Sequence, residues 1–419
     1  MNRRPTQEEF TVADIMEGVR ILEVAEHTFV PAASAVLADW GAEVIKVEHP
    51  ERGDAMRGLA SSGVMPSMGA VHVLLEHSNR GKKSIAIDVS TEKGLELIYR
   101  LAATSDVFLT NKVPAVRKKL KIEADDIRAH NPNIIYVAGT GGGERGPEAD
   151  RGGYDFLSYW CRAASAMGTT PTDVEFLAGQ PGPGYGDSIG GMTIAGGIMG
   201  ALFHRERTGE ALTVDVSLLG VGMWAMSPAI ALSLQLGFPW RPGPSVGGGA
   251  GPANPLVGTY RTSDGRFLAM SCLQGFKYWP SACRVIGRPE LIDDERFSTA
   301  EQLAANAAEA RAILNEVIRA APIAEWRERF DSFEGQWSVA QDSLEVVEDP
   351  QAVANGYLGE TTTRDGTPFT LVTTPVQFGG VPAPPKRAPE FNEHCEEVLA
   401  SIECGTEEML ELKVDGVVA

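Results

Sequence analysis

The sequence has 419 residues, of which 43% are hydrophobic, so the chain can bury a large core and has room for two or three domains. Its net charge of −19 argues against a nucleic-acid partner or an anionic membrane, because an acidic surface repels phosphate. A ligand that carries phosphate therefore needs a local basic patch. These properties are typical of a globular protein of enzyme size.

The cysteines argue against both a disulfide framework and a metal site. They are odd in number, widely spaced and without a Cys-x-x-Cys pair, which fits a reducing cytoplasm and no bound metal; they are Cys161, Cys272, Cys283, Cys395 and Cys404. The N-terminus lacks the apolar core of a secretion signal. Residues 216–240 are uncharged but contain Pro228 and Pro239, which favours two buried helices joined by a break over a membrane span.

The N-terminal part alternates strands with helices. Val19–Val24 is a short apolar strand candidate, Pro31 suits the first turn of a helix that continues over Ala32–Trp40, Gly41 ends it, and Glu43–Val47 is the next strand. The same alternation continues over Ser84–Val89, Glu92–Ala103, Val107–Thr110, Ala124–His130 and Ile134–Ala138. An α/β fold follows, with a Rossmann-like, doubly wound parallel sheet.

The first strand-to-helix turn, residues 25–30, contains no glycine. The glycine fingerprint that brings a dinucleotide pyrophosphate onto a helix N-terminus is therefore absent, which disfavours an NAD-dependent dehydrogenase. The turn still points helix N–H groups into the first crevice of the sheet, an arrangement that suits an anion or a developing oxyanion. His27 lies at this crevice.

The second half predicts a smaller α+β domain. Proline and glycine crowd residues 241–252, and hairpin strands follow at Gly258–Arg261 and Arg266–Met270. Further along, helices are expected at Thr299–Ala321 and Ile323–Phe333, and strands at Tyr357–Thr363 and Phe369–Val372. The expected division is a large domain over 1–215, a linker over 216–240, a small domain over 241–335 and a return segment over 336–419 that completes the large domain.

Asp187 is the leading catalytic candidate. It lies in Gly-Tyr-Gly-Asp-Ser-Ile-Gly-Gly, residues 184–191, where glycines allow a close approach of backbone and ligand. The uncharged run Met192–Phe203 behind it should hold the carboxylate away from bulk water and make it a better nucleophile. The alternative is that Asp187 only caps the N-terminus of a helix over Ser188–Phe203.

Several short motifs, in their order and spacing, resemble the family III CoA-transferases, or CaiB/BaiF family, which includes carnitine CoA-transferase, formyl-CoA transferase and α-methylacyl-CoA racemase. The resemblance runs nearly end to end. Its carriers are Gly18–Val24, Leu37–Glu48 with Gly53, Asp54 and Arg57, Asn79–Asp88, Gly153–Asp155, Gly186–Asp187, Arg207–Glu210, Val214–Leu218, His394–Leu399 and Asp415–Ala419.

This resemblance implies an acyl-CoA:carboxylate CoA-transferase in which Asp187 is the nucleophile. Its carboxylate attacks the donor thioester, the resulting mixed anhydride becomes an aspartyl-CoA thioester, and CoA then moves to the acceptor acid. Each step exchanges one activated acyl bond for another, so no metal or permanently bound cofactor is expected; coenzyme A enters only as part of the substrate. The family also implies a homodimer of interlocked subunits.

The resemblance assigns further site residues. The glycine run that includes Gly247, Gly248 and Gly249 is similar to a mobile loop over the intermediate, with an inter-domain linker as the alternative. Formyl-CoA transferase has glutamine at the end of this loop, where Pro252 or Asn254 stands here. Five cations are candidates for binding the CoA phosphates, a solvated helix face being the alternative for Arg117; they are Arg57, Arg80, Lys82, Lys112 and Arg117.

His27, Thr28 and Tyr154 are the expected substrate contacts. Formyl-CoA transferase has glutamine where Thr28 stands, which weakens an oxalate or formate assignment. Related racemases have histidine where Tyr154 stands, and tyrosine, with a pKa near ~10, is a poor base at neutral pH. CoA transfer is therefore the leading hypothesis, with an α-methylacyl-CoA racemase and a catalytically silent CoA-binding subunit as alternatives.

Overall fold

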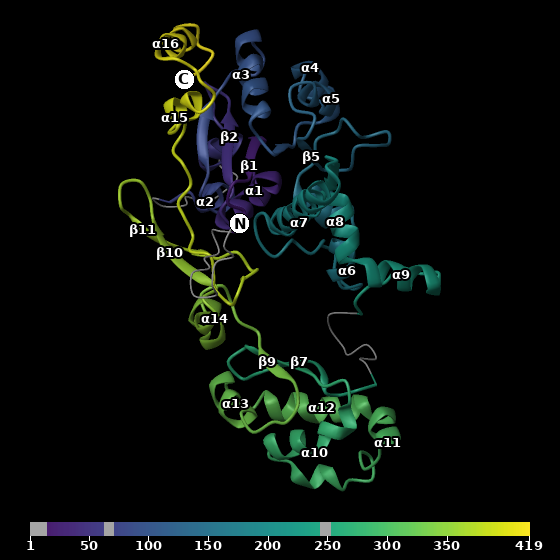
Figure 1. Ribbon diagram of the computed structural model, residues 1–419. Coiled ribbons are helices and arrows are strands. Elements are labelled where there is room, and N and C mark those ends of the chain that lie inside the picture. The colour runs from purple at the N-terminus through teal and green to yellow at the C-terminus, as the bar shows by residue number, and fades with distance from the viewer. Residues whose placement is uncertain (1–14, 63–70, 244–252) are drawn as a thin grey trace. The chain divides into compact units, whose positions relative to one another are not determined.

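The computed structural model describes residues 15–62, 71–243 and 253–419, and contacts divide the chain into two units (Figure 1). Unit 1 comprises residues 1–170, 176–241 and 351–419, and unit 2 comprises residues 171–175 and 242–350. An inserted second unit agrees with the predicted order of segments. Unit 2 ends later than the predicted small domain, because the chain returns to unit 1 after Pro350 and not after residue 335. Residues 216–240 are not a linker, because they belong to unit 1.

Unit 1 is built on a six-stranded sheet in the order β3-β2-β1-β4-β5-β6, in which every pair of neighbours is parallel. This order confirms the predicted doubly wound, Rossmann-like sheet. The strands are β1 (Arg20–Val24), β2 (Glu43–Glu48), β3 (Lys83–Ala86), β4 (Val107–Thr110), β5 (Ile135–Thr140) and β6 (Thr213–Ser217). The sequence did not predict β6, an edge strand whose residues are intermediate or exposed.

Residues of the four central strands, β1, β2, β4 and β5, pack into two cores on opposite faces of this sheet. Ile21 and Val44 belong to the core that includes residues of α1 (Phe29–Asp39), α7 (Tyr185–Thr208) and α8 (Leu218–Ala225). Leu22 and Ile45 belong to the other core, which includes α3 (Glu92–Ala103), α5 (Ala124–Arg128), α15 (Cys395–Ala400) and α16 (Thr406–Val414). Period-two alternation of this kind is what a sheet covered on both faces requires.

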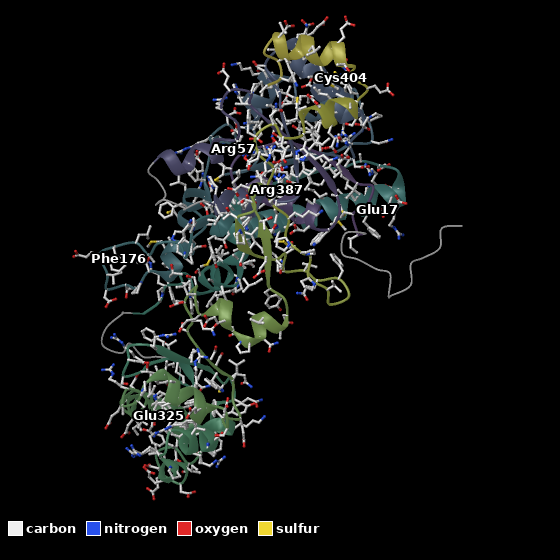
Figure 2. All side chains as sticks on the ribbon, turned by 90° about the vertical axis from the view of Figure 1, so that its left-hand side faces the viewer. Glu17, Arg57, Phe176, Glu325, Arg387 and Cys404 are labelled. Atoms are coloured by element: carbon white, nitrogen blue, oxygen red, sulfur yellow. The ribbon has the colours of Figure 1, made fainter. Side chains whose placement is uncertain are left out.

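The C-terminal segment completes unit 1, as predicted for the return segment. Ile87 after β3 pairs with Val418, and the Arg57 guanidinium donates to the Pro389 carbonyl oxygen across 3.1 Å. Figure 2 shows Arg57 and Arg387 in the same part of the molecule. The remaining elements of this unit are η2 (Ala55–Ser62), α2 (Val73–Asn79), α4 (Pro114–Leu120), η3 (Phe156–Cys161), α6 (Ser165–Thr169), α9 (Ser227–Leu236), α14 (Pro350–Ala354, its first residue in unit 2) and the hairpin of β10 (Leu358–Thr362) and β11 (Pro368–Val372).

Unit 2 has a core of its own, formed by a three-stranded antiparallel sheet and helices. Trp279, Trp326 and Phe330 are among its fully buried side chains. The predicted helix over 299–321 is interrupted at Asn306 and forms α11 and α12. The elements are β7 (Val257–Arg261), β8 (Phe267–Ser271), β9 (Trp337–Val339), α10 (Gly275–Val285), η4 (Pro289–Ile292), α11 (Ala300–Ala305), α12 (Ala307–Ile318), α13 (Ile323–Phe330) and η5 (Val346–Glu348).

In the part of the chain that the structure describes, no single helix has the length and apolar character needed to cross a membrane. Helices α8 and α9 pass that test of length and composition only as a pair, and they meet at a bend of 68°.

Candidate active site

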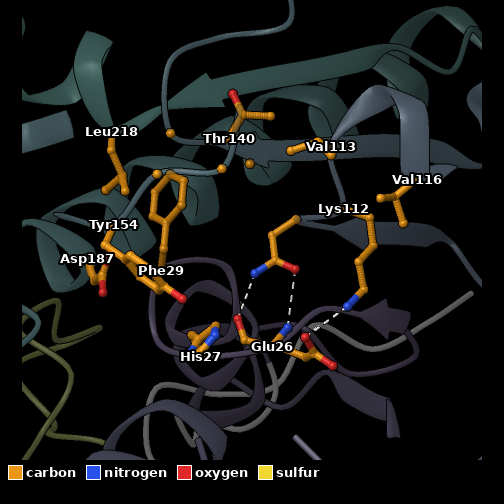
Figure 3. Close-up of a pocket in the computed structure, with 15 residues that line it drawn as sticks. Glu26, His27, Phe29, Lys112, Val113, Val116, Thr140, Tyr154, Asp187 and Leu218 are labelled. Carbon is orange, nitrogen blue, oxygen red and sulfur yellow. Dashed lines mark hydrogen bonds and ion pairs between the residues drawn. The ribbon is translucent and has the colours of Figure 1, made fainter. Parts of the chain in front are cut away.

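A pocket of about 270 Å³ opens at the carboxyl ends of the central strands of unit 1 (Figure 3). Glu26, His27 and Phe29 reach it from the turn after β1, residues 111–113 from the turn after β4, and residues 139–141 from the end of β5. Because α1 and α4 leave β1 and β4 in opposite directions along the sheet order, this is the topological switch point of the fold. Ligands of doubly wound folds bind at such a point. Tyr154, Asp187 and Leu218 also line the pocket.

Asp187 is not a helix cap. Helix α7 begins at Tyr185, with Gly184 at the N-cap position in the left-handed region at φ 67°, so Asp187 is the third helical residue. No side chain caps this helix, and the alternative role expected for Asp187 is therefore wrong. The first turn of α7 carries the carboxylate into the pocket.

The glycines after Asp187 bring α7 close to α1. A Cβ atom on Gly190 would lie 2.3 Å from the Phe29 ring, and one on Gly191 would lie 2.7 Å from the Ala32 Cβ. Both separations are too short for real atoms, so only glycine permits this contact. The sequence motif thus serves helix packing, which sets Asp187 beside the N-terminus of α1.

Burial raises the pKa of Asp187 to about 7, and the charge of Asp155 adds to this effect. A carboxylate with this pKa is present in both protonation states near neutral pH, and its ionised form is more basic than an ordinary carboxylate. Among the described residues, no hydrogen bond or ion pair engages the Asp187 side chain. It is therefore free to react.

Asp155 is held in place by two donors. Its Oδ1 accepts from its neighbour's backbone N–H, that of Phe156, at 2.7 Å, and its Oδ2 accepts from the Gln180 amide at 3.2 Å. The same amide donates to the Gly182 carbonyl oxygen at 3.0 Å, so Gln180 links Asp155 to the segment that precedes α7. Sequence reasoning missed Gln180, since nothing in an isolated glutamine marks it as a neighbour of the site.

His27 and Tyr154 face each other in the pocket. Their rings meet edge to face with centroids 5.4 Å apart. Figure 3 shows both on the same side of the pocket as Asp187, with Lys112 and Val116 on the other side. Thr28, expected as a third substrate contact, is buried and does not line the pocket.

Lys82 does not contact the pocket, and the structure corrects its expected role in phosphate binding. It is buried, and its ammonium group lies 2.8 Å from Glu23 and donates to the Pro31 carbonyl oxygen at 2.9 Å. Lys46 acts similarly on the other side of Glu23, donating to the Ala25 carbonyl oxygen at 3.0 Å. These two lysines hold both ends of the turn that carries His27.

Two of the other expected phosphate contacts need correction for the same reason. Arg80 is buried, and its Nε lies 2.9 Å from Asp39. Arg117 is buried against Glu144, to which its guanidinium donates at 2.9 Å. Charge along a sequence does not distinguish a solvated cation from one that neutralises an internal carboxylate.

Arg57 and Lys112 are more accessible, and only Lys112 lines the pocket. Arg57 makes a bidentate contact with Glu48, with its nitrogen atoms 2.7 and 2.8 Å from the carboxylate oxygens. Lys112 pairs with Glu26 at 3.0 Å and is half-buried. Lys112 is therefore the one expected phosphate contact that the structure brings to the site.

A second pocket adjoins the first and shares Glu26, Lys112 and Val116 with it. It follows the ends of β2 and β3 and is lined by two exposed cations, Arg52 and Lys119. Neither cation has an ion pair among the described residues. The sequence analysis missed both as site residues, because they converge only when the strand ends are brought together.

The predicted catalytic loop at Gly247, Gly248 and Gly249 lies outside the described residues. Within residues 15–62, 71–243 and 253–419, no group of three or more His, Cys, Asp or Glu side chains is arranged to hold a metal ion.

The sequence matches the family model described as CoA-transferase family III over residues 16–395. The chain belongs to CoA-transferase family III. Among its relatives, the (R)-2-hydroxy-4-methylpentanoate CoA-transferase of Clostridioides difficile is 29% identical over 396 residues, which cover 93% of this chain and 95% of that protein. The cinnamoyl-CoA:phenyllactate CoA-transferase of Clostridium sporogenes is 29% identical over 414 residues, which cover 96% and 97%.

A solved structure supports the same assignment. A CaiB/BaiF family protein from Brucella suis aligns with a TM-score of 0.76 at 28% identity, covering 92% of this chain and 98% of that one. The protein is therefore an enzyme of the CoA-transferase type, and an acyl-CoA and a carboxylic acid are substrates that fit its relatives.

Proposed function

We propose that this enzyme transfers CoA from an acyl-CoA donor to a free carboxylic acid through covalent intermediates on Asp187. The observation that carries the proposal is a carboxylate with a pKa of about 7, which no described residue pairs with, in a pocket at the switch point of the sheet. An ordinary carboxylate is a weak nucleophile, and removal from water makes it stronger.

The reaction would proceed by four acyl exchanges. An Asp187 oxygen attacks the thioester carbonyl carbon, the carbon–sulfur bond breaks, and CoA leaves as a thiolate from a mixed anhydride. The thiolate attacks the Asp187 carbonyl carbon and releases the donor acid. The acceptor carboxylate then attacks the aspartyl thioester, and the thiolate finally attacks the acceptor carbonyl carbon of the second anhydride, which regenerates Asp187.

The chain's own groups supply what these steps need. The thiolate leaves and returns without a change in oxidation state, so we propose that the enzyme works with no resident cofactor or metal. Water must be kept from the anhydride and thioester, since hydrolysis would waste them. The apolar side chains of Phe29 and Leu218 in the pocket wall favour this exclusion.

The phosphates of CoA are proposed to bind in the second pocket. Arg52 and Lys119 are exposed cations on a protein of net charge −19, and Lys112 connects them to the pocket of Asp187. Guanidinium and ammonium groups are suitable phosphate ligands. An extended ligand would run from these cations past Lys112 to bring its thioester to Asp187.

The exposed apolar surface of α8 and α9 supports a homodimer. No residue of α9 is buried, Trp224 is 81% exposed and Leu234 is 79% exposed. Large apolar side chains this exposed on two successive helices are costly on a monomer in water if they form one patch. We propose that a second copy of the chain covers it.

The runner-up activity is exchange of the α-proton of an acyl-CoA. It is favoured by one observation, which is that the His27 ring lines the same pocket as Asp187 and could act as a second acid/base group. Incubation with a 2-methylacyl-CoA in heavy water distinguishes the two activities. CoA transfer without deuterium at the α-carbon supports the transferase, whereas incorporation at the rate of turnover without transfer to any acid would support the racemase.

The direct test of function is a transfer assay with dialysed enzyme and a chelator. A panel of acyl-CoA donors is combined with a panel of carboxylic acids, and new thioesters are identified by mass spectrometry. Transfer by the native enzyme and its loss in Asp187→Asn is the expected result. Full activity of Asp187→Asn, or transfer only after a metal is added, would contradict the proposal.

A further inference from the structure

Asp187 lies in the first turn of α7, which lacks the usual support of a helix start. No side chain caps this helix, and Gly184 at the N-cap position has no side chain to contribute. The first N–H groups of a helix have no partner within it, and helix ends fray for that reason. Since no hydrogen bond or ion pair among the described residues engages the Asp187 side chain, its position depends on the backbone of this turn.

A chain of hydrogen bonds from another helix reaches the turn. His77 is a residue of α2, and its Nε2 atom lies 3.1 Å from the Oγ atom of Ser188, the residue after Asp187. The Ser188 hydroxyl group donates to the Gly184 carbonyl oxygen at 2.8 Å, and the Ser188 backbone N–H donates to the same oxygen at 2.8 Å. His77 is thereby connected, through Ser188, to the N-cap residue of α7.

The direction of each bond follows from the protons available. A serine hydroxyl has one proton, and because a carbonyl oxygen can only accept, that proton goes to Gly184. The Ser188 oxygen therefore accepts from His77. Burial lowers the pKa of His77 to about 4, and the positive charge of Arg80 adds to this effect. The imidazole is thus neutral at neutral pH, and its single proton is assigned to Nε2, where it is donated to Ser188.

The other end of this chain is anchored in the core of unit 1. The Arg80 Nη1 atom donates to the His77 carbonyl oxygen at 3.3 Å, and the Arg80 Nε atom lies 2.9 Å from Asp39, the last residue of α1. The Thr374 hydroxyl group donates to the same carboxylate. Arg80, Asp39 and Thr374 are all buried. Buried polar contacts therefore fix the end of α2 from which His77 reaches α7.

A serine and a histidine at this distance can also form a nucleophilic pair, and the structure argues against that role. Neither side chain lines the pocket of Asp187. The Ser188 proton is directed to Gly184 and not to the imidazole, and a histidine with a pKa of about 4 is a weak base near neutral pH. The pair is suited to holding a backbone segment and not to attacking a substrate.

We propose that His77 is a positioning residue, which acts through Ser188 to fix the first turn of α7 and thereby the Asp187 carboxyl group in the pocket. This inference rests on the proposed function, because it takes Asp187 as the nucleophile. Each of the four acyl exchanges makes or breaks a bond at the Asp187 carboxyl group, so the rate of each depends on where that group lies. A displacement of about 1 Å can lower a rate about a hundredfold.

The test compares substitutions that remove the donor at position 77 with one that keeps it. His77→Leu removes the donor, His77→Gln keeps an amide N–H, Ser188→Ala removes the hydroxyl group, and a double variant combines His77→Leu with Ser188→Ala. The constants kcat and KM are measured separately with one acyl-CoA donor and one acid to which the native enzyme transfers CoA. Thermal unfolding verifies that each variant is folded.

His72→Leu is the matched control on the same helix. The His72 ring accepts from the Leu75 N–H at 3.2 Å and lies 2.9 Å from the Met56 carbonyl oxygen, so its contacts support α2 and do not involve α7. This variant should lower the temperature of unfolding without changing kcat. A loss of kcat equal to that of His77→Leu would show that any damage to α2 slows the enzyme, and would overturn the inference.

His77→Leu and Ser188→Ala should each lower kcat at least about tenfold, while KM for the acyl-CoA stays within about twofold, because the contacts that bind CoA are retained. His77→Gln should recover most of the rate. The double variant should be no slower than the slower single variant, as expected when two side chains act as one unit.

A native kcat in folded His77→Leu, or independent losses that multiply in the double variant, would overturn the inference. If His77→Leu does not fold, Ser188→Ala decides, and a native kcat in that variant would overturn it. Asp187→Asn separates this result from the proposed function. An active Asp187→Asn would contradict the proposed function, whereas an inactive Asp187→Asn beside an unaffected His77→Leu would contradict the role of His77 alone.

Discussion

Lys82 donates a hydrogen bond to the Pro31 carbonyl oxygen across 2.9 Å, inside the protein and beneath the turn that carries His27. Its ammonium group also lies 2.8 Å from Glu23. A lysine from a motif expected to bind phosphate thus supports the candidate active site. Buried basic residues such as Lys82 are therefore expected to affect the stability of the fold, and exposed ones such as Lys119 to affect ligand binding.

Replacing Lys82 by methionine should destabilise the fold, and replacing Lys119 should weaken substrate binding. Removing one partner of a buried ion pair typically costs about 3–5 kcal/mol, whereas an exposed substitution changes stability by about 0.5 kcal/mol or less. Thermal unfolding should therefore distinguish Lys82→Met from Lys119→Met. Lys119→Met should instead raise KM for the acyl-CoA several-fold with little change in kcat, because phosphate contacts are equal in ground and transition states.

Arg52→Met is the companion to Lys119→Met, and the effects of both should shrink at high salt, which screens exposed charges. An unchanged KM in both variants would remove the CoA phosphates from the second pocket. A stable, foldable Lys82→Met with a raised KM would contradict the structural role of Lys82.

The pH dependence of the reaction should report the ionisation of Asp187. Its pKa is raised to about 7, and in the proposed mechanism only the carboxylate attacks the thioester, so kcat/KM should rise about tenfold per pH unit below pH 7 and level off above it. Asp155→Asn removes the neighbouring charge and should move this rise to lower pH by up to about one unit. Gln180→Leu removes the amide that donates to Asp155, and it should therefore also shift the pH at which kcat/KM rises.

An identical profile in the native enzyme and Asp155→Asn would mean that burial alone sets the pKa of Asp187. Because Asp155 lies beside the substrate pocket, kcat/KM profiles are to be measured with two donors of different acyl groups. A shift that differs between donors would trace to the substrate and would count against Asp155 acting through Asp187.

Removing the charge of Asp187 should stabilise the fold at alkaline pH. The folded-state pKa of about 7 lies above the ordinary aspartate pKa of 3.8, so the folded protein binds more protons and native stability falls as pH rises between these values. Asp187→Asn lacks this loss. It should therefore be more stable than the native enzyme at pH 8, by at least about 1 kcal/mol, since one pKa unit corresponds to about 1.4 kcal/mol.

The matched comparison is at pH 4, where most of this difference should disappear because the Asp187 carboxyl is largely protonated in the folded native protein. Chemical denaturation at both pH values measures it. A variant that is less stable at pH 8 by the same amount as at pH 4 would indicate that Asp187 has a structural role.

The exposed apolar side chains of α8 and α9 predict a dimer that depends on Trp224 and Leu234. Sedimentation equilibrium should give twice the mass of the 44.8 kDa chain, and a Trp224→Asp, Leu234→Asp double variant should shift the population toward monomer. A matched pair of substitutions at exposed Leu410 and Val414 of α16 should leave the mass unchanged. A native protein that remains monomeric at micromolar concentration would contradict the proposed interface.

Much of the sheet could be predicted from the sequence, because apolar runs such as Val107–Thr110 and helix signals such as those of Glu92–Ala103 are local. Strand β6 escaped prediction since its alternating Thr-Val-Asp-Val-Ser lies at an edge and is half-exposed. Asn306 interrupts a helix that composition alone would continue. Both differences arise from the tertiary structure, which the local sequence pattern does not contain.

The site was predictable only in part for the same reason. Asp187 is marked by its flanking glycines, although their contacts with Phe29 and Ala32 appear only when α7 packs on α1. Lys82 and Arg80 were candidate phosphate ligands, but both are buried and form internal ion pairs with Glu23 and Asp39. Arg52 and Lys119 lie far apart in sequence, and only the shared edge of the parallel strands brings them to one pocket.

The most direct measurement of the central proposal is the transfer of oxygen to Asp187. In the proposed sequence the acceptor acid contributes the bridging oxygen of the second anhydride. When the CoA thiolate attacks the acceptor carbonyl carbon, the bond between that carbon and the bridging oxygen breaks, and the oxygen stays on Asp187. After single turnover with an acceptor labelled with oxygen-18 in its carboxylate, mass spectrometry of the peptide that contains Asp187 should show one heavy oxygen on this side chain. CoA transfer at the normal rate with no label on Asp187 would contradict the covalent mechanism.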